Sequence, residues 1–274
     1  MTDAALYRLL GRDGDAELFV PPPPTDGPGG PTHRGGPAPP LLGRAPDRHE
    51  PRPDTRLARV TIELLGPVPI SQVRVRTHIE RPGRKIELLG AELDALMPDG
   101  QWRRCATGSA WRLACQDTSD VVWDAAKPQQ LLDDASPSAL AELFPSAWLE
   151  YGFVGTIDWR ISRRSHTPGE PTLAWTDLRC AVVEGEEPSP LERLLAVSDT
   201  ANGVGARLDP TQFTFLNTEL TVHLHQAPTG RWVGIEAETS VGADGIANSS
   251  GILHAESGPV GRVNQSVLVE RITS

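Results

Sequence analysis

The chain has 274 residues and is acidic, with 36 Asp and Glu against 26 Lys and Arg and a formal net charge of -10. It has no basic block and no aromatic platform in a basic setting, which argues against nucleic acid as a partner. Its mean hydropathy is -0.30, and no apolar run is long enough to cross a bilayer. The N-terminus lacks the basic start and apolar core of a signal peptide, so a cytoplasmic location is expected.

The cysteines and histidines give no metal signature. Cys105, Cys115 and Cys180 are an odd number at no metal-ligand spacing, and they are predicted to be reduced thiols. His223 and His225 are two apart, a spacing that can chelate zinc from a strand, but the sequence suggests no third ligand. No metal and no other cofactor is therefore expected.

The N-terminal half is predicted to be mostly strand. Residues 5–20 could form a short strand pair, and the Pro- and Gly-rich residues 21–40 should lack regular structure. At the end of that stretch Gly35-Gly36-Pro37 is expected to open a short helix, since proline is tolerated in a first turn. Alternating residues separated by turn signals then predict four strands, at 56–65, 71–80, 84–96 and 101–114.

The C-terminal half repeats this order of elements. Residues 116–147 are rich in loop-forming residues, with a short capped helix predicted from Ser136. Two strands are expected at 153–163 and 171–183. An amphipathic helix is then predicted from Ser189, its N-cap, to Gly203, with further strands up to the C-terminus.

A carboxylate stands where the strand after residue 218 begins. From Leu220 to Leu224 every second residue is apolar, so these side chains should share one face of the strand. Glu219 falls on the other face. The simplest interpretation is a solvent-facing residue, and the alternative is a carboxylate that handles a water molecule.

The two halves can be laid over each other. VTIELLGPVPISQVRV, residues 60–75, aligns with LTVHLHQAPTGRWVGI, residues 220–235. Each half then consists of a helix followed by several long antiparallel strands. A sheet wrapped around a helix, made twice in one chain, covers every apolar face and predicts an α+β fold.

Six stretches resemble the acyl-CoA thioesterase II-like family of double hotdog proteins, in particular its actinobacterial branch: THRGGPAPPLLGRA, VTIELLGPVP, RPGRKIELLGAEL, LLAVSDTANGVG, NTELTVHLHQAPTGRWVGIEAET and GPVGRVNQSVLVER. The resemblance implies an N-terminal hotdog over residues 1–134 and a C-terminal hotdog over residues 135–274 that carries the site. It also implies hydrolysis of an acyl-CoA or acyl-carrier thioester to a free acid and a thiol.

The resemblance assigns roles to particular residues of the second half. In that family a carboxylate, a hydroxyl and a glutamine hold the water that attacks the thioester. These roles fall on Glu219, on either Thr239 or Ser240, and on Gln265. A water held in this way needs an acceptor for its proton and donors for the developing oxyanion.

The first half supplies a check on these residues and a further candidate. The positions that match Glu219 and Gln265 in the repeat are Arg59 and Gly108, so one active site per chain is expected. Helix N-termini stabilise negative charge. The predicted start of the first helix is therefore the expected contact for the oxyanion and the substrate, through His33, Gly35 and Gly36.

The densest basic turn of the chain lies on a predicted hairpin and is the candidate to bind CoA phosphates: Arg81, Arg84 and Lys85. An ordinary solvated hairpin is the alternative interpretation. The pair Asp199 and Asn202 lies near a helix end and is interpreted as a capping or packing feature, with a role in a pocket left open.

Two other functions stay open at this point. One is a double hotdog that binds acyl-CoA or an acyl chain without hydrolysing it. The other is a hydratase or dehydratase on the same fold, which would need an Asp and a His close together on a helix and its approach. Hotdog sheets pair across edges and faces, which would also allow a homo-oligomer to form.

Overall fold

A computed structural model describes residues 4–22, 32–33, 36–131 and 152–272. The first group of elements is β1 (Ala5–Asp13), β2 (Ala16–Val20), β3 (Thr32–His33), α1 (Ala38–Arg48), β4 (Thr55–Leu64), β5 (Val68–Pro69), β6 (Val73–Arg81), β7 (Ile86–Leu96), β8 (Trp102–Ala114) and the short 3-10 helix η1 (Ser119–Val121). The predicted strand pair, first helix and following four strands are thereby confirmed.

The second group is α3 (Gly152–Gly155), β9 (Ile157–Arg163), β10 (Thr172–Leu178), β11 (Ala181–Val183), α4 (Pro190–Ser198), α5 (Ala201–Val204), β12 (Phe213–Asn217), β13 (Glu219–Leu224), β14 (Val233–Val241), β15 (Ile246–Ala255) and β16 (Gly258–Arg271). The strand predicted over 153–163 therefore begins with a helical turn. The helix predicted from Ser136 and the division between residues 134 and 135 lie outside the described residues.

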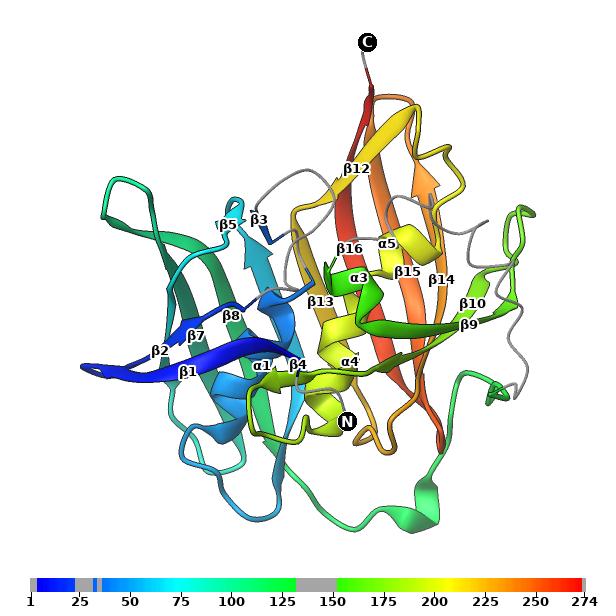
Figure 1. Ribbon diagram of the computed structural model, residues 1–274. Coiled ribbons are helices and arrows are strands. Elements are labelled where there is room, and N and C mark those ends of the chain that lie inside the picture. The colour runs from blue at the N-terminus through cyan, green and yellow to red at the C-terminus, as the bar shows by residue number, and fades with distance from the viewer. Residues whose placement is uncertain (1–3, 23–31, 34–35, 132–151, 273–274) are drawn as a thin grey trace.

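One curved sheet surrounds the helices. Fourteen of the described strands join it in the order β11-β1-β2-β6-β7-β8-β4-β13-β16-β15-β14-β10-β9, with β12 also paired to β16. Only Arg179 and Cys180 separate β10 from β11, yet these strands lie near opposite ends of that order. The sheet must therefore curl until its ends approach each other, around the helices seen inside it in Figure 1.

The two halves share this sheet through β4 and β13. These strands pair antiparallel, with Leu220 opposite Ile62 and Val222 opposite Val60, all of them buried. The expected α+β double hotdog is therefore confirmed, with one correction: the two wrapped sheets are a single continuous one. Backbone hydrogen bonds across this seam remove the unpaired edges that two separate sheets would expose.

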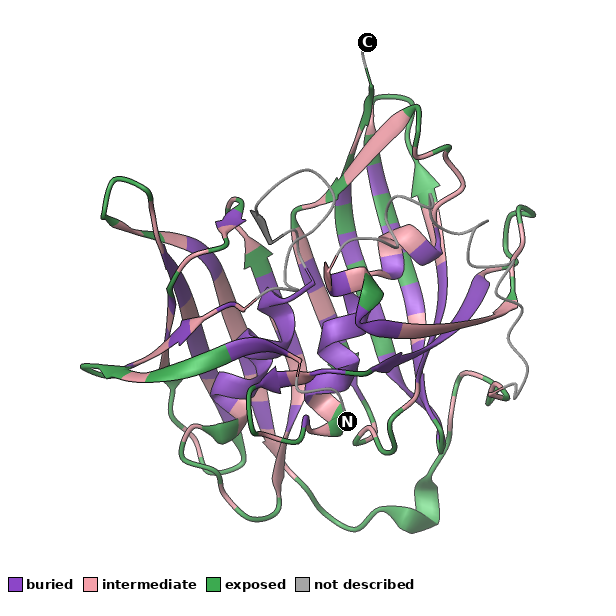
Figure 2. Ribbon diagram, in the orientation of Figure 1, coloured by how far each residue is buried: buried purple, intermediate pink, exposed green. Residues whose placement is uncertain are grey.

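The helices cover one of the two faces of the sheet. The face that α1, α4 and α5 cover is called the inner face, and the opposite one the outer face. Side chains alternate between them along each strand. Figure 2 shows the resulting alternation of buried and exposed residues on the long C-terminal strands. None of the helices in the described part of the chain is long and apolar enough to span a membrane.

α1 and α4 pack closely at the centre of the molecule. A Cβ atom added at Gly43 of α1 would overlap the side chain of Leu195 of α4, which is fully buried. Beside this contact the buried guanidinium of Arg44 donates to Glu186 and to Glu17. Glycine thus permits the close approach, and the ion pairs satisfy the buried charge next to it.

The helix predicted from Ser189 to Gly203 is broken. Its start is as expected, because Ser189 caps Glu192 N–H and Glu192 in turn accepts from Ser189 N–H. The helix ends at Ser198, however, and α5 begins only at Ala201. The hydroxyl groups of Ser198 and Thr200 donate to carbonyl groups of the last turn, and such local bonds compete with helix continuation. Asp199 lies at the break.

We expect Gly43→Val to lower the free energy of unfolding by about 1–3 kcal/mol, because the added side chain overpacks the contact with Leu195. Equilibrium urea unfolding measures this loss. Gly66→Ala is the control, since a Cβ at Gly66 meets no atom within 4 Å. Equal midpoints for the two variants would contradict the packing argument.

Candidate active site

A β-bulge where β12 meets β13 places the side chain of Glu219 on the outer face. Asn217 of β12 lies opposite Val267, whereas Thr221 of β13 lies opposite Asn264. The two strands therefore have one residue more than β16 between these pairs, and Thr218 and Glu219 both face Ser266. Thr218 N–H donates to the carbonyl of Ser266, and Ser266 N–H donates to the carboxylate of Glu219 at 2.8 Å.

Glu219 stabilises this bulge. Besides Ser266 N–H, its carboxylate accepts the hydroxyl of Thr221 at 3.0 Å. A strand N–H that a bulge leaves without a carbonyl partner needs another acceptor, which Glu219 supplies. Ser266 is exposed and Leu220 is fully buried, so Glu219 lies on the outer face. This contact answers why a carboxylate stands where the strand begins.

Gln265 faces the other way. Its side chain is fully buried on the inner face and contacts the segment between α4 and α5. The structure does not bring Glu219 and Gln265 together, because the sheet lies between the two side chains. Of the two predicted hydroxyl residues, Thr239 lies on the inner face, and Ser240 is exposed opposite the exposed Asn248.

Three polar side chains form a row across the inner face. Thr239 of β14 lies opposite Ser249 of β15, which in turn lies opposite Gln265 of β16. These three residues are called the polar row. The hydroxyl groups of Thr239 and Ser249 are buried and have no hydrogen-bond partner among the residues that the structure describes. An unmet buried hydroxyl is costly, which is typical of a place where water or a ligand binds.

The amide of Gln265 is held in one orientation. Its Oε1 accepts Asn202 N–H at 2.9 Å, and its Nε2 donates to the carbonyl of Asp199 at 3.1 Å. If the amide were flipped, its NH₂ group would face Asn202 N–H and its oxygen would face the carbonyl of Asp199. One N–H of Nε2 has no further partner among these bonds and can donate to a bound molecule.

Asp199 brings a carboxylate to the same face. Its Oδ1 accepts Asn217 Nδ2–H at 2.7 Å, and Asn217 lies on the inner face two positions from Gln265 along the paired strand. Burial raises the pKa of Asp199 to about 6, against the hydrogen bond from Asn217, which lowers it. A carboxylate with such a pKa accepts a proton near neutral pH, unlike an exposed one.

A narrow slot opens beside the polar row. It lies between the segment that includes α5 and strands β12, β14 and β16, with mostly apolar walls: Ala206, Leu208, Phe215, Val241, Val267 and Val269. Its polar members are Asn202, Arg207 and Thr239. It has room for about one water molecule, about 10 Å³.

The described residues of the first half form no matching polar row. Gly108 pairs with Ile62 on one side and Ala91 on the other, and Leu42 of α1 lies over it. By strand register it is Ala110, opposite Val60, that takes the place of Gln265, and Ala110 and Gly108 both present only apolar groups there. This arrangement supports the expectation of one site per chain.

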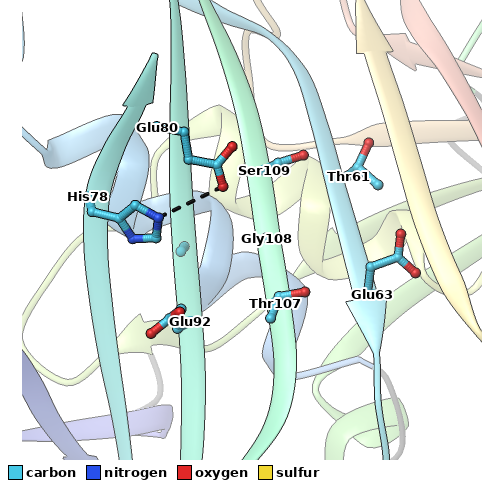
Figure 3. A pocket seen from close by; sticks show the side chains of 9 residues that line it. Thr61, Glu63, His78, Glu80, Glu92, Thr107, Gly108 and Ser109 are labelled. Carbon is cyan, nitrogen blue, oxygen red and sulfur yellow. Dashed lines mark ion pairs between the residues drawn. The ribbon is translucent and has the colours of Figure 1, made fainter. Parts of the chain in front are cut away.

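A larger hollow of about 260 Å³ lies on the outer face of the first half. Figure 3 shows the carboxylates of Glu63, Glu80 and Glu92 around it, together with His78. His78 and Glu80 lie over Gly90, where a side chain would collide with both. Because Glu63 pairs with Glu219, this hollow adjoins the bulge and is separated from the polar row by the sheet.

The predicted oxyanion contact at the first helix is not favoured by the structure. α1 begins at Ala38 after Pro37, and the next two residues are prolines, which have no N–H to donate. At Gly36 the ring of Phe153 lies where a side chain would be. Gly35 is outside the described residues, and the backbone of His33 pairs with Val68 in a short ladder.

The predicted phosphate contact lies far along the sheet. Arg81, Arg84 and Lys85 are exposed on the β6–β7 hairpin, and Arg81 donates to the carbonyl of Ile86. Three strands separate β7 from β16. Binding of CoA phosphates at this hairpin stays a prediction.

The described residues contain no group of three or more His, Cys, Asp and Glu side chains that could hold a metal ion. His225 instead lies 2.8 Å from Asp124, and His223 is exposed. Cys105 and Cys180 are buried, Cys115 is exposed, and all three are free.

Two members of the site were missed in the sequence. Ser249 is flanked two residues away by Ala247 and Gly251, the small residues of a buried strand face, and that pattern could have marked it as inward. Asn217 lies in the alternating stretch before Glu219 but on the opposite face, because the bulge reverses the alternation. No local signal reveals the bulge.

We expect Glu219→Ala to lower the free energy of unfolding by about 1 kcal/mol, because Ser266 N–H and the Thr221 hydroxyl lose their acceptor. Urea unfolding of Glu63→Ala, on the facing strand, is the matched control, and it should change stability by less than about 0.5 kcal/mol. The role of Glu219 in the bulge is wrong if both variants unfold at the same urea concentration.

Comparisons with solved structures support the fold. An acyl-CoA thioesterase II from Mycobacterium marinum is 12% identical, with a TM-score of 0.67 over 100% of this chain and 99% of that one. A hot dog fold protein from Alicyclobacillus acidocaldarius is 14% identical, with a TM-score of 0.66 over 96% of each chain. A dehydratase domain of the curacin polyketide synthase is 14% identical, with a TM-score of 0.51 over 99% of this chain and 100% of that one. The fold alone therefore does not select a reaction.

The family models are more specific. Residues 22–113 match the acyl-CoA thioesterase N-terminal domain, and residues 129–269 match the acyl-CoA thioesterase C-terminal domain. The comparison with curated proteins gave no match. Since the C-terminal domain model alone spans more than half of the 274 residues, the chain belongs to the acyl-CoA thioesterase family.

Proposed function

We propose that this protein hydrolyses an acyl-CoA or acyl-carrier thioester at the polar row of its C-terminal half, with Asp199 as the proton acceptor. One observation carries the proposal. Two buried hydroxyl groups without partners and an oriented glutamine lie on one face together with a buried carboxylate, in the half that matches the thioesterase C-terminal domain.

The hydroxyl groups of Thr239 and Ser249 would hold the attacking water with Gln265. The water oxygen bonds to the thioester carbon while one water proton passes to Asp199. The remaining Nε2–H of Gln265 donates to the developing oxyanion. The carbon–sulfur bond then breaks, and the departing thiolate takes the proton from Asp199. The products are a free acid and a thiol, and Asp199 is again ionised.

The environment of Asp199 suits a base better than that of Glu219. Asp199 is 8% exposed and shares the inner face with Gln265. Glu219 is engaged by Ser266 N–H and the Thr221 hydroxyl on the outer face. A base within reach of the water and with a pKa near the working pH is the effective one.

Asp199→Asn is expected to lower kcat/KM for thioester hydrolysis by about 10²- to 10⁴-fold, because the water loses its proton acceptor. The measurement is thiol release from acyl-CoAs between acetyl and palmitoyl, with aryl and branched members. Glu219→Gln is the control and should keep wild-type turnover. If Glu219→Gln abolishes turnover while Asp199→Asn keeps it, the base is not Asp199. Stabilisation by acyl-CoA without thiol release in the wild type would favour the non-catalytic binding protein.

The pH dependence of hydrolysis should follow Asp199. Its pKa of about 6 means that kcat/KM rises as the pH increases through about 6 and is constant above it.

The same raised pKa of Asp199 means that the folded state binds this proton more tightly than the unfolded chain. Ionised Asp199 therefore reduces stability above its unfolded pKa of 3.8, and the reduction is complete once the pH exceeds about 6. Asp199→Asn should thus melt at a higher temperature than the wild type at pH 8 and not at pH 4. A kcat/KM that stays unchanged from pH 5 to pH 8 would contradict this assignment.

A further inference from the structure

Two residues that line the slot beside the polar row carry donors that no group of the described chain satisfies. Arg207 lines it, and the guanidinium Nη1 of Arg207 is buried and has no hydrogen-bond partner. Thr239 lines it as well, with its buried hydroxyl unpartnered. The remaining walls are largely the alkyl and phenyl groups of the six apolar residues named above. A buried unmet donor costs free energy that a ligand with an acceptor atom would recover.

Arg207 is held firmly in place. Its Nη2 donates to Glu238 Oε1 at 2.7 Å, to the carbonyl of Thr167 at 2.9 Å and to that of Glu170 at 3.4 Å. With these three acceptors on one nitrogen, the planar guanidinium has little freedom to turn. Its Nη1 is therefore pre-organised, and pre-organised donors bind an acceptor with little further loss of entropy.

We propose that the slot recognises a neutral oxygen, a hydroxyl or keto group, on the acyl chain of the substrate close to the thioester carbonyl. This proposal rests on the proposed thioesterase function. It follows that an oxygen-bearing acyl thioester is preferred over the plain acyl thioester of the same length. Arg207 and Thr239 are the residues that select it.

Charge and size both favour such an oxygen. The charge of Arg207 is already balanced by Glu238, so a second carboxylate in this apolar slot would have no counter-charge. The space of about 10 Å³ fits one oxygen-bearing group and not a hydrocarbon tail. A keto oxygen can accept from both donors. A hydroxyl can accept from Arg207 and donate to Thr239.

The slot lies next to the polar row, and this position indicates where along the substrate the recognised oxygen lies. Thr239 belongs both to the slot and to the row, and the close approach of Gly205 to Thr239 leaves no room for a side chain between them. Arg207 follows Gly205 by two residues. The recognised oxygen therefore lies within a few bonds of the reacting carbonyl.

The test compares paired substrates within each protein. Butyryl-CoA, 3-hydroxybutyryl-CoA, acetoacetyl-CoA and succinyl-CoA are measured with the wild type and with Arg207→Lys, which keeps the charge pair with Glu238 and removes the second donor. In the wild type kcat/KM for the hydroxy or keto ester should exceed that for butyryl-CoA by about 10- to 100-fold. In Arg207→Lys this ratio should fall to near one.

Three results would overturn the proposal. They are equal rates for plain and oxygenated esters in the wild type, a preference that survives in Arg207→Lys, and a stronger preference for succinyl-CoA than for the neutral oxygen. A loss of rate on all esters alike in Arg207→Lys would assign the donors to the carbonyl or the pantetheine arm. Arg207→Met with Glu238→Gln removes both charges and serves as a second variant if Arg207→Lys fails to fold.

Failure of the thioesterase function itself gives a different result. If the wild type releases no thiol from any ester, the same four esters are compared by the shift of the melting temperature. A larger shift with the hydroxy or keto ester than with butyryl-CoA, lost in Arg207→Lys, supports the recognition without turnover. Equal shifts overturn it.

Discussion

The close contact between α1 and α4 is the constraint on which the rest of the structure depends. One continuous sheet has to curl around both helices, so their separation sets its curvature. Gly43 allows α1 to approach Leu195 of α4, and the ion pairs of buried Arg44 hold Glu17 and Glu186 beside that contact. The seam between β4 and β13 then completes a sheet without an open edge between the halves.

Two local irregularities of this regular scaffold bring the residues of the candidate site together. The break after Ser198 ends α4 above the sheet and brings Asp199 and Asn202 to Gln265. The bulge at Thr218 and Glu219 shifts the register by one residue, so that Asn217 lies on the inner face and reaches Asp199. A straight helix or an unbulged strand would each move one partner away from the others. Irregularities of this kind are common next to active sites.

The sheet separates two sets of polar residues with different roles. On the outer face, carboxylates such as Glu219 and Glu63 border a hollow or satisfy the strand backbone. On the inner face the polar groups are few, buried and partly unmet, as with the hydroxyl groups of Thr239 and Ser249. Water exclusion strengthens electrostatic interactions, which favours the inner face as the place of the proposed chemistry.

The sequence by itself determined the repeat, most strands and the cap at Ser189, because these depend on local patterns of period and capping. Gln265 was named by the resemblance to the thioesterase family. Alternation from Leu220 even assigned Glu219 to the face opposite the apolar residues. Only the tertiary structure decided which residues meet. A side chain's face depends on strand register, and one added residue reverses it. The bulge, the helix break at Asp199 and the alignment of Ser249 with Gln265 arise from pairing between distant segments, so no single stretch of sequence contains them.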